Sequence, residues 1–212
     1  MKYSALIVAA GAGKRMNLGY NKVYHQLEDG DRIIDKTIKT FKEDDDCKQI
    51  IVVTNKDNFY QLKDYYSGEF ILVEGGSTRS ESVFNGLKAV SQEYVFVHDG
   101  ARCYLNNNNL SDLKTCLKKE DACILAVKAV DTIKRVKDGY IEETIDRNQI
   151  YYAQTPQAFK FDLLYNSYIE ANRKNLNFTD DASLVEGVSA CRIKVVIGSY
   201  ANKKITTIND LK

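Results

Sequence analysis

The 212-residue chain has no tryptophan, only two histidines and a single proline, Pro156, which by itself marks a loop. Its five cysteines include no Cys-x-x-Cys pair, and two histidines are too few to complete a zinc-like cluster. An odd number of cysteines leaves one unpaired in any disulfide scheme, so we expect reduced thiols and a cytoplasmic protein. The sequence therefore predicts no metal site made of protein ligands alone.

Long apolar segments and an excess of one charge are missing as well. The longest apolar runs fall far short of the ~20 residues that span a bilayer. Residues 6–10 are too short for the apolar part of an export signal, and Lys14 and Arg15 follow where a mature chain would begin. Thirty basic residues balance 29 acidic ones, giving a net charge of +1. We therefore expect neither a membrane nor a nucleic acid as a partner.

Short apolar runs alternate with helical patterns along most of the chain. Continuous apolar runs indicate strands buried on both faces, so the sequence predicts an α/β fold with a mostly parallel sheet flanked by helices. The length fits a single domain of residues 1–212. Strands are expected at 3–9, 48–54, 69–74, 94–98, 122–127 and 192–197, and helices at 33–42, 58–66, 80–90, 110–119 and 161–173.

One segment breaks this alternation. Residues 132–136 and 140–145 have strand-like sequences on either side of an Asp-Gly turn, which indicates a β-hairpin. The hairpin has too few apolar residues to be stable alone, so residues 131–153 are predicted to project as a β-arm and pack on a partner. The acidic run 43–46 and the four asparagines 106–109 are interpreted as solvated loops without chemistry.

The loop after the first expected strand combines small residues with cations. From Ala9 to Met16 its sequence is AAGAGKRM. Small residues let backbone N–H groups approach a ligand closely, and successive amides form a concavity that binds anions. Arg15 adds a planar, permanent charge suited to phosphate, and Lys22 adds a second cation. A polyphosphate is the expected ligand; on this motif alone, a glycine-rich turn beside solvated cations is an equal alternative.

Single positions exclude two more common phosphate-binding motifs. A P-loop needs Gly at position 8 and Ser or Thr at position 15, where the chain has Val8 and Arg15. A dinucleotide-binding fingerprint needs Gly or Ala at position 16, where Met16 stands. The loop therefore matches neither motif.

Two other polar segments follow expected strands. Residues 75–83 (GGSTRSESV) combine two glycines with hydroxyls that could simply cap the next helix. Residues 98–102 (HDGAR) place an acid and an arginine after the fourth strand. Asp99 could bind ribose hydroxyls or a metal, or only form an ion pair with Arg102; His98 is interpreted as a core-edge residue rather than a base. Because ligands bind outside the carboxyl ends of parallel strands, the three segments are expected to converge on one edge.

Five further motifs complete a pattern that resembles a known family. They are DTIKR (131–135), DRN (146–148), QTPQAF (154–159), TDDAS (179–183) and KKIT (203–206). Together, over essentially the whole chain, the motifs resemble the 2-C-methyl-D-erythritol 4-phosphate cytidylyltransferases of the non-mevalonate isoprenoid pathway. The resemblance implies a Rossmann-like nucleotidyltransferase fold with a projecting β-arm and a homodimer. It also implies transfer of CMP from CTP to the polyol phosphate, with release of pyrophosphate and with Mg²⁺ held mainly through the CTP phosphates.

The resemblance gives a role to each matching residue. Arg15 and Lys22 match the two cations that stabilise the transition state. Arg147 and Lys204 match cations that bind the methylerythritol phosphate, and Arg147 with Thr132 would do so in the neighbouring subunit's site. The implied CTP-binding positions are Ala9, Ala10, Gly11, Ala12, Gly13, Gly76, Glu81, Ser82 and Asp99, and the other implied substrate-binding positions are Arg102 and Thr179.

The chain departs from the family pattern at several of these positions. Glu81 stands where Asp is usual, which would shift a hydrogen bond by one methylene. Cys103 replaces the proline that usually follows Arg102, so a looser turn is expected there. Tyr20 and Asn21 precede Lys22 where proline is common, which leaves the rigidity of the loop before Lys22 in question.

Two other functions stay open at this point. A ribitol-5-phosphate cytidylyltransferase would share the fold and the chemistry, but that group typically has Ser-Val where this chain has Gly100-Ala101. A catalytically inactive module that only binds a sugar phosphate belongs to another class. The presence of both Arg15 and Lys22 argues against it, because binding alone does not require both cations at this spacing.

Overall fold

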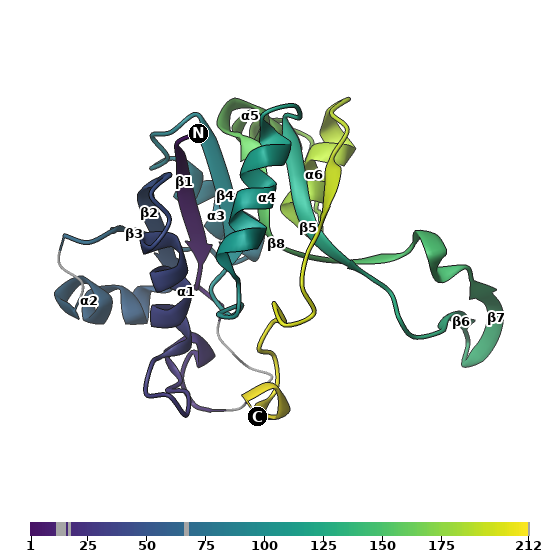
Figure 1. The fold of residues 1–212 in the computed structure, drawn as a ribbon, viewed down its shortest axis with the longest axis horizontal. Helices are drawn as coiled ribbons and strands as arrows, with labels where there is room; N and C mark the ends of the chain where they lie inside the picture. Colours follow the sequence, from purple (N-terminus) through teal and green to yellow (C-terminus); the bar gives the residue numbers. More distant parts are fainter. Residues whose placement is uncertain (12–15, 17, 66–67, 212) are drawn as a thin grey trace.

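A seven-stranded sheet forms the centre of the protein, and helices cover both of its faces (Figure 1). The computed structural model describes residues 1–11, 16, 18–65 and 68–211. Its strands are β1 (Tyr3–Val8), β2 (Cys47–Thr54), β3 (Ile71–Glu74), β4 (Tyr94–Asp99), β5 (Ala122–Lys128), β6 (Ile133–Lys137), β7 (Tyr140–Ile145), β8 (Tyr151–Lys160) and β9 (Lys194–Ile197). Its α-helices are α1 (Ile33–Lys42), α2 (Lys56–Tyr65), α3 (Arg79–Leu87), α4 (Asn107–Leu117), α5 (Phe161–Arg173) and α6 (Asp181–Val188), and its short 3₁₀ helices are η2 (Lys22–Tyr24), η3 (Arg147–Gln149) and η4 (Ile208–Leu211).

The strand order is β3-β2-β1-β4-β8-β5-β9. Strands β1 to β4 pair in parallel, and so do β5 and β9, while β8 lies antiparallel between β4 and β5. The predicted mostly parallel α/β sheet is therefore confirmed, with one antiparallel strand that the sequence did not predict.

Strand β8 contains Pro156, so the interpretation of this proline as a loop marker is wrong. The register between β5 and β8 shifts between Ile124 and Ala126, which pair with Gln157 and Ala153. Pro156 lies inside this irregularity and beyond the last residue that pairs with β4. A β-bulge is one of the few places in a sheet that tolerate the missing N–H of proline.

Each face of the sheet has its own apolar core. On one face, α1 and α4 contribute Ile34, Phe41 and Leu113. On the other face, α3, α5 and α6 contribute residues such as Val83 and Leu164. The buried residues of α1 recur at the three- and four-residue spacing of one helix face, which explains why this helix could be predicted with its observed bounds.

The N-terminal ends of α4 and α6 show capping that the sequence analysis did not identify. Asn106 is the N-cap of α4, where its side chain accepts a hydrogen bond from the Asn109 backbone, and Asn109 is buried. The interpretation of residues 106–109 as a solvated loop is therefore wrong. Helix α6 was not predicted, although Asp180 and Ser183 form a capping box that marks its start.

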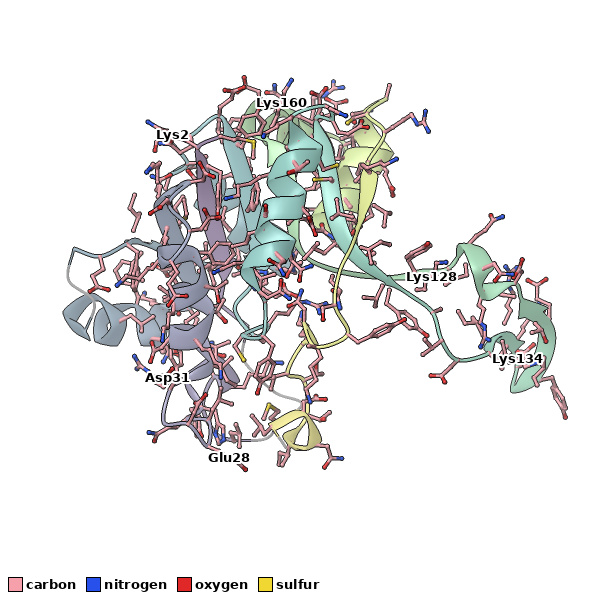
Figure 2. All side chains as sticks on the ribbon, viewed as in Figure 1. Lys2, Glu28, Asp31, Lys128, Lys134 and Lys160 are labelled. Carbon is pink, nitrogen blue, oxygen red and sulfur yellow. The ribbon has the colours of Figure 1, made fainter. Side chains whose placement is uncertain are left out.

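The predicted hairpin is present and projects from the rest of the chain (Figure 1). Strands β6 and β7 form a separate two-stranded sheet. Its turn residues Asp138 and Gly139 both have positive φ, as the favoured two-residue hairpin turns require. Figure 2 shows Lys128 where the chain leaves the sheet and Lys134 on the arm itself. Among the described residues, no helix has both the length and the apolar character needed to cross a membrane.

Candidate nucleotide site

A cavity of about 440 Å³ opens where β1 and β4 end. It is lined by the loop after β1, the start of η2, the loop before α3, the end of β4 and Lys204. The expected convergence of the three motif-bearing segments on one sheet edge is confirmed. Of the implied CTP-binding positions, the lining residues include Ala9, Ala10 and Gly11 as well as Gly76, Ser82 and Asp99. Ala12, Gly13 and Arg15 lie outside the described residues.

The loop before α3 is shaped by close packing and by hydroxyl groups. A Cβ atom on Gly75 would lie 2.5 Å from the Ala10 Cβ, so only glycine fits there. The Ser82 hydroxyl accepts a hydrogen bond from the Gly76 N–H at 3.0 Å and donates one to the Thr78 carbonyl at 2.8 Å. Thr78 caps α3, so the capping interpretation and the ligand interpretation of this motif are compatible.

Glu81 turns back onto the same loop. Its carboxylate accepts hydrogen bonds from both the backbone N–H and the hydroxyl of Ser77, each at 2.7 Å. These bonds lower the pKa of the Glu81 carboxyl. In the described structure, Glu81 therefore holds the loop from its exposed side through Ser77.

Asp99 is the point where three cations meet. Its carboxylate lies 2.8 Å from the Lys204 Nζ, 3.4 Å from the Arg79 Nε and 3.8 Å from the Arg102 Nε. Burial alone would raise the pKa of Asp99, but the charges of Arg79, Lys204 and Arg102, with the hydrogen bond from Lys204, hold it below its usual range. Asp99 is therefore a fixed negative charge in a cavity lined by cations.

Arg79 is a site residue that the sequence analysis did not single out. It lines the cavity, and its Nη2 donates a hydrogen bond to the Asp181 carboxylate at 2.8 Å. Asp181 is fully buried and also accepts a 2.6 Å hydrogen bond from the Tyr168 hydroxyl. Arg79 thus bridges two acids that lie far apart in the sequence. Its place inside the GGSTRSESV motif was the only available signal.

His98 lies in the core, as its interpretation predicted. It is fully buried, and burial lowers its pKa to about 4. The Arg102 carbonyl can only accept, so the neutral imidazole carries its proton on Nε2 and donates it to that carbonyl at 3.1 Å. The Nδ1 atom then accepts from the Thr155 hydroxyl at 3.0 Å, and that hydroxyl accepts a hydrogen bond from the Asp99 N–H. His98 supports the segment that holds Asp99.

The segment after Asp99 is firmly held. The Arg102 N–H donates to the Asp99 carbonyl at 3.0 Å, and the Arg102 side chain donates to the Asn202 carbonyl at 2.8 Å. Cys103 is buried in an apolar cluster with Ile205. Core packing therefore restrains the turn at Cys103, where the sequence analysis expected a looser one.

The remaining implied substrate-binding residues do not gather at this cavity within the described part of one chain. Thr132 precedes β6 and Arg147 begins η3, so both belong to the projecting arm (Figure 1). Both are exposed, and the Arg147 side chain donates a hydrogen bond to the Val130 carbonyl. Thr179 is exposed just before α6, with its hydroxyl 3.4 Å from that of Ser183. Only Lys204 reaches the cavity itself.

Comparison with known proteins agrees with this fold. Residues 3–212 match the family described as IspD: 2-C-methyl-D-erythritol 4-phosphate cytidylyltransferase. A relative of that name from Bacillus licheniformis is 44% identical, with 100% of this chain and 93% of the relative covered. A second relative of that name, from Geobacillus thermodenitrificans, is 41% identical, and the match covers 100% of this chain and 94% of the relative.

Solved structures give the same result. The crystal structure of the 4-diphosphocytidyl-2C-methyl-D-erythritol synthase from Anaerococcus prevotii is similar with a TM-score of 0.86 and 34% identity, covering 99% of this chain and 94% of that one. The cytidylyltransferase of Francisella tularensis has a TM-score of 0.83 and 32% identity, covering 100% and 97%. The Rossmann-like fold implied by the sequence motifs is confirmed. The chain belongs to the 2-C-methyl-D-erythritol 4-phosphate cytidylyltransferase family.

Proposed function

We propose that this protein transfers CMP from CTP to 2-C-methyl-D-erythritol 4-phosphate, giving 4-diphosphocytidyl-2-C-methyl-D-erythritol and pyrophosphate for isoprenoid precursor synthesis. Family membership over residues 3–212 carries this proposal. The cavity supports it, because small residues at the end of β1 line it together with Lys22, Arg79 and Lys204. Backbone amides and fixed cations are the groups that bind a triphosphate.

A pyrophosphate-release assay tests the reaction directly. We expect release with CTP and 2-C-methyl-D-erythritol 4-phosphate together, and no comparable rate when ribitol 5-phosphate replaces the second substrate. Faster release with ribitol 5-phosphate would favour the related transferase. Absence of release with either polyol phosphate, while CTP still binds, would favour a module that only binds.

The proposed chemistry is a single in-line displacement. An oxygen of the polyol phosphate attacks the α-phosphorus of CTP, the bond to the β-phosphate bridging oxygen breaks, and pyrophosphate leaves. The nucleophile is an anion near neutral pH, so no general base is needed. The barrier comes from repulsion between phosphates and from charge that develops on the α-phosphate. Catalysis then consists of positioning and electrostatic stabilisation, which we assign to Arg15 and Lys22.

The residues of the cavity fit a metal held mainly by the nucleotide. Asp99 is the one carboxylate among the described lining residues, and Lys204 and Arg79 already engage it. We therefore propose that CTP phosphates and water supply most of the ligands of Mg²⁺, which would neutralise part of the triphosphate charge.

The second substrate requires a second subunit in this proposal. The arm exposes apolar side chains, with Tyr140 79% and Ile141 64% exposed, and an isolated two-stranded hairpin is marginal in water. We propose that the arm packs on a partner copy and brings Thr132 and Arg147 to the partner's cavity. Lys204, Arg102 and Thr179 would act in their own chain.

Subunit mixing tests this arrangement. At methylerythritol phosphate concentrations below the wild-type KM, Arg147→Ala and Lys22→Ala homodimers should each have little activity, because each lacks one half of every site. Mixed dimers contain one site with both halves intact, so an equimolar mixture should recover about a quarter of wild-type activity after subunit exchange, given a two-fold dimer. Light scattering at assay concentration provides the control. A monomer, or a dimer without recovery on mixing, would contradict the shared site.

A further inference from the structure

The turn that brings Lys22 to the cavity is tied to the end of β1 by one buried side chain. Asn21 is 5% exposed and is the N-cap of η2. Its Nδ2 donates a 2.6 Å hydrogen bond to the Ala9 carbonyl, and its Oδ1 accepts one from the Val23 N–H at 3.3 Å. A single carboxamide thus joins the loop that would receive the triphosphate to the residue next to Lys22.

Fixing the Ala9 carbonyl also fixes the backbone amide of Ala10, a residue that lines the cavity. The Ala9 carbonyl and the Ala10 N–H belong to one planar, trans peptide unit and point in opposite directions. Ala9 is held from its other side as well, because its own N–H donates to the Val53 carbonyl at 2.7 Å. The hydrogen bond from Asn21 therefore sets the direction of the Ala10 N–H relative to Lys22.

Two outer contacts hold the rest of the same turn. The Tyr20 hydroxyl lies 2.8 Å from the His25 Nδ1, and the two rings are nearly parallel. The Tyr24 hydroxyl lies 2.7 Å from the Thr54 hydroxyl at the end of β2. These contacts hold residues before and after Lys22, whereas the side chain of Asn21 connects the turn to the end of β1 through the Ala9 carbonyl.

We propose that Asn21 is a positioning residue for cytidylyl transfer: it holds Lys22 and the Ala9–Ala10 peptide in one mutual geometry before CTP binds. This inference rests on the proposed function. A carboxamide is needed because the role combines a donor for Ala9 with an acceptor for Val23. Misplacement of a charged group by about 1 Å can cost on the order of 10²-fold in rate, so the effect belongs in kcat rather than in CTP affinity.

Three substitutions of Asn21 distinguish the effect of its side-chain hydrogen bonds from the effect of its backbone conformation. Asn21→Ala removes both hydrogen bonds, and Asn21→Asp keeps the acceptor but loses the donor to Ala9. We expect each to lower kcat roughly 10- to 100-fold while KM for CTP stays within about threefold. Asn21 has φ −68° and ψ 120°, values that proline adopts. Asn21→Pro should therefore restrict the turn by another route and recover part of the lost kcat.

Asn106→Ala is the matched control. Asn106 also caps a helix through its side chain, with a 2.9 Å hydrogen bond from the Asn109 N–H, and it is exposed. The Asn106→Ala variant should show a fall in Tm comparable to that of Asn21→Ala but keep the wild-type kcat. In the Lys22→Ala background, Asn21→Ala should lower kcat by a smaller factor than it does in the wild type, because only the Ala9–Ala10 peptide is then left to position.

The outcomes separate the inference from the proposed function. If the wild-type protein releases no pyrophosphate with CTP and methylerythritol phosphate, the proposed function fails. If the wild type is active and Asn21→Ala keeps its kcat, or if the losses from Asn21→Ala and Lys22→Ala multiply, the positioning role is wrong. If kcat and Tm fall together in all three Asn21 variants, Asn21 is merely structural and the inference is overturned as well.

Discussion

Lys22→Ala is expected to lower kcat by roughly 10²–10³-fold, the range measured when one preorganised donor to a developing oxyanion is removed. KM for CTP should change much less, because the loop after β1 and the segment around Gly76 still bind the nucleotide. We expect the same loss of kcat for Arg15→Ala, on the basis of the family resemblance. Steady-state rates of pyrophosphate release with CTP varied at saturating polyol phosphate measure both parameters.

An exposed lysine elsewhere provides the control for charge alone. Lys39 lies on the exposed side of α1, so Lys39→Ala removes one positive charge without touching the cavity. It should leave kcat within about twofold of the wild type, as surface substitutions rarely alter more. Near-wild-type turnover in both Lys22→Ala and Arg15→Ala would contradict their proposed role in the transition state.

Lys204→Met and Arg147→Met are expected to raise KM for methylerythritol phosphate by about 10- to 100-fold, the equivalent of losing one charge-assisted hydrogen bond to phosphate. KM for CTP should stay nearly unchanged. Arg147→Lys should recover only part of the affinity, because a point charge replaces a planar group that can bind two phosphate oxygens.

The neighbouring residue Lys203 gives a close control for this prediction. It is exposed and does not line the described cavity, so Lys203→Met should leave both KM values near those of the wild type. In Lys204→Met, Asp99 keeps Arg79 as a partner at 3.4 Å, so its carboxylate is not left without a counter-charge. Equal weakening of CTP and of the polyol phosphate would show that Lys204 and Arg147 support the nucleotide or the fold instead.

The sequence predicted the parts of the sheet whose signal is local. Strands β1, β2 and β4 each contain a continuous apolar run, at residues 5–8, 50–53 and 94–97, and the ends of β1 and β4 located the cavity. Strand β8 was missed because Gln157 and Thr155 interrupt its apolar run and Pro156 is a strand breaker in most contexts. These polar side chains can be buried because each forms a hydrogen bond with a residue far away in the sequence. Thr155 accepts the Asp99 N–H, and Gln157 donates to Asp180 before α6 at 2.7 Å.

The pairing of charged side chains could not be predicted either, because the partners lie far apart in the sequence. Arg79 and Asp181 are 102 residues apart, and nothing near either residue in the sequence identifies the other as its partner. Asn21 was considered only as a departure from a proline, yet its side chain supplies the rigidity that the departure put in question. Local patterns show where a backbone turns, whereas the contacts of long polar side chains depend on how distant elements pack.

The β-arm can also be described as the connection of a hairpin. Strands β5 and β8 are antiparallel neighbours in the central sheet, and the arm is simply the chain between them. The entropic cost of closing such a connection grows slowly, by only about 0.6 kcal/mol for each doubling of its length. Insertions and deletions within it leave the register of the sheet, and so the place of Asp99 beside Thr155, unchanged. The surface proposed to contact a partner copy can therefore diverge in evolution faster than the cavity does.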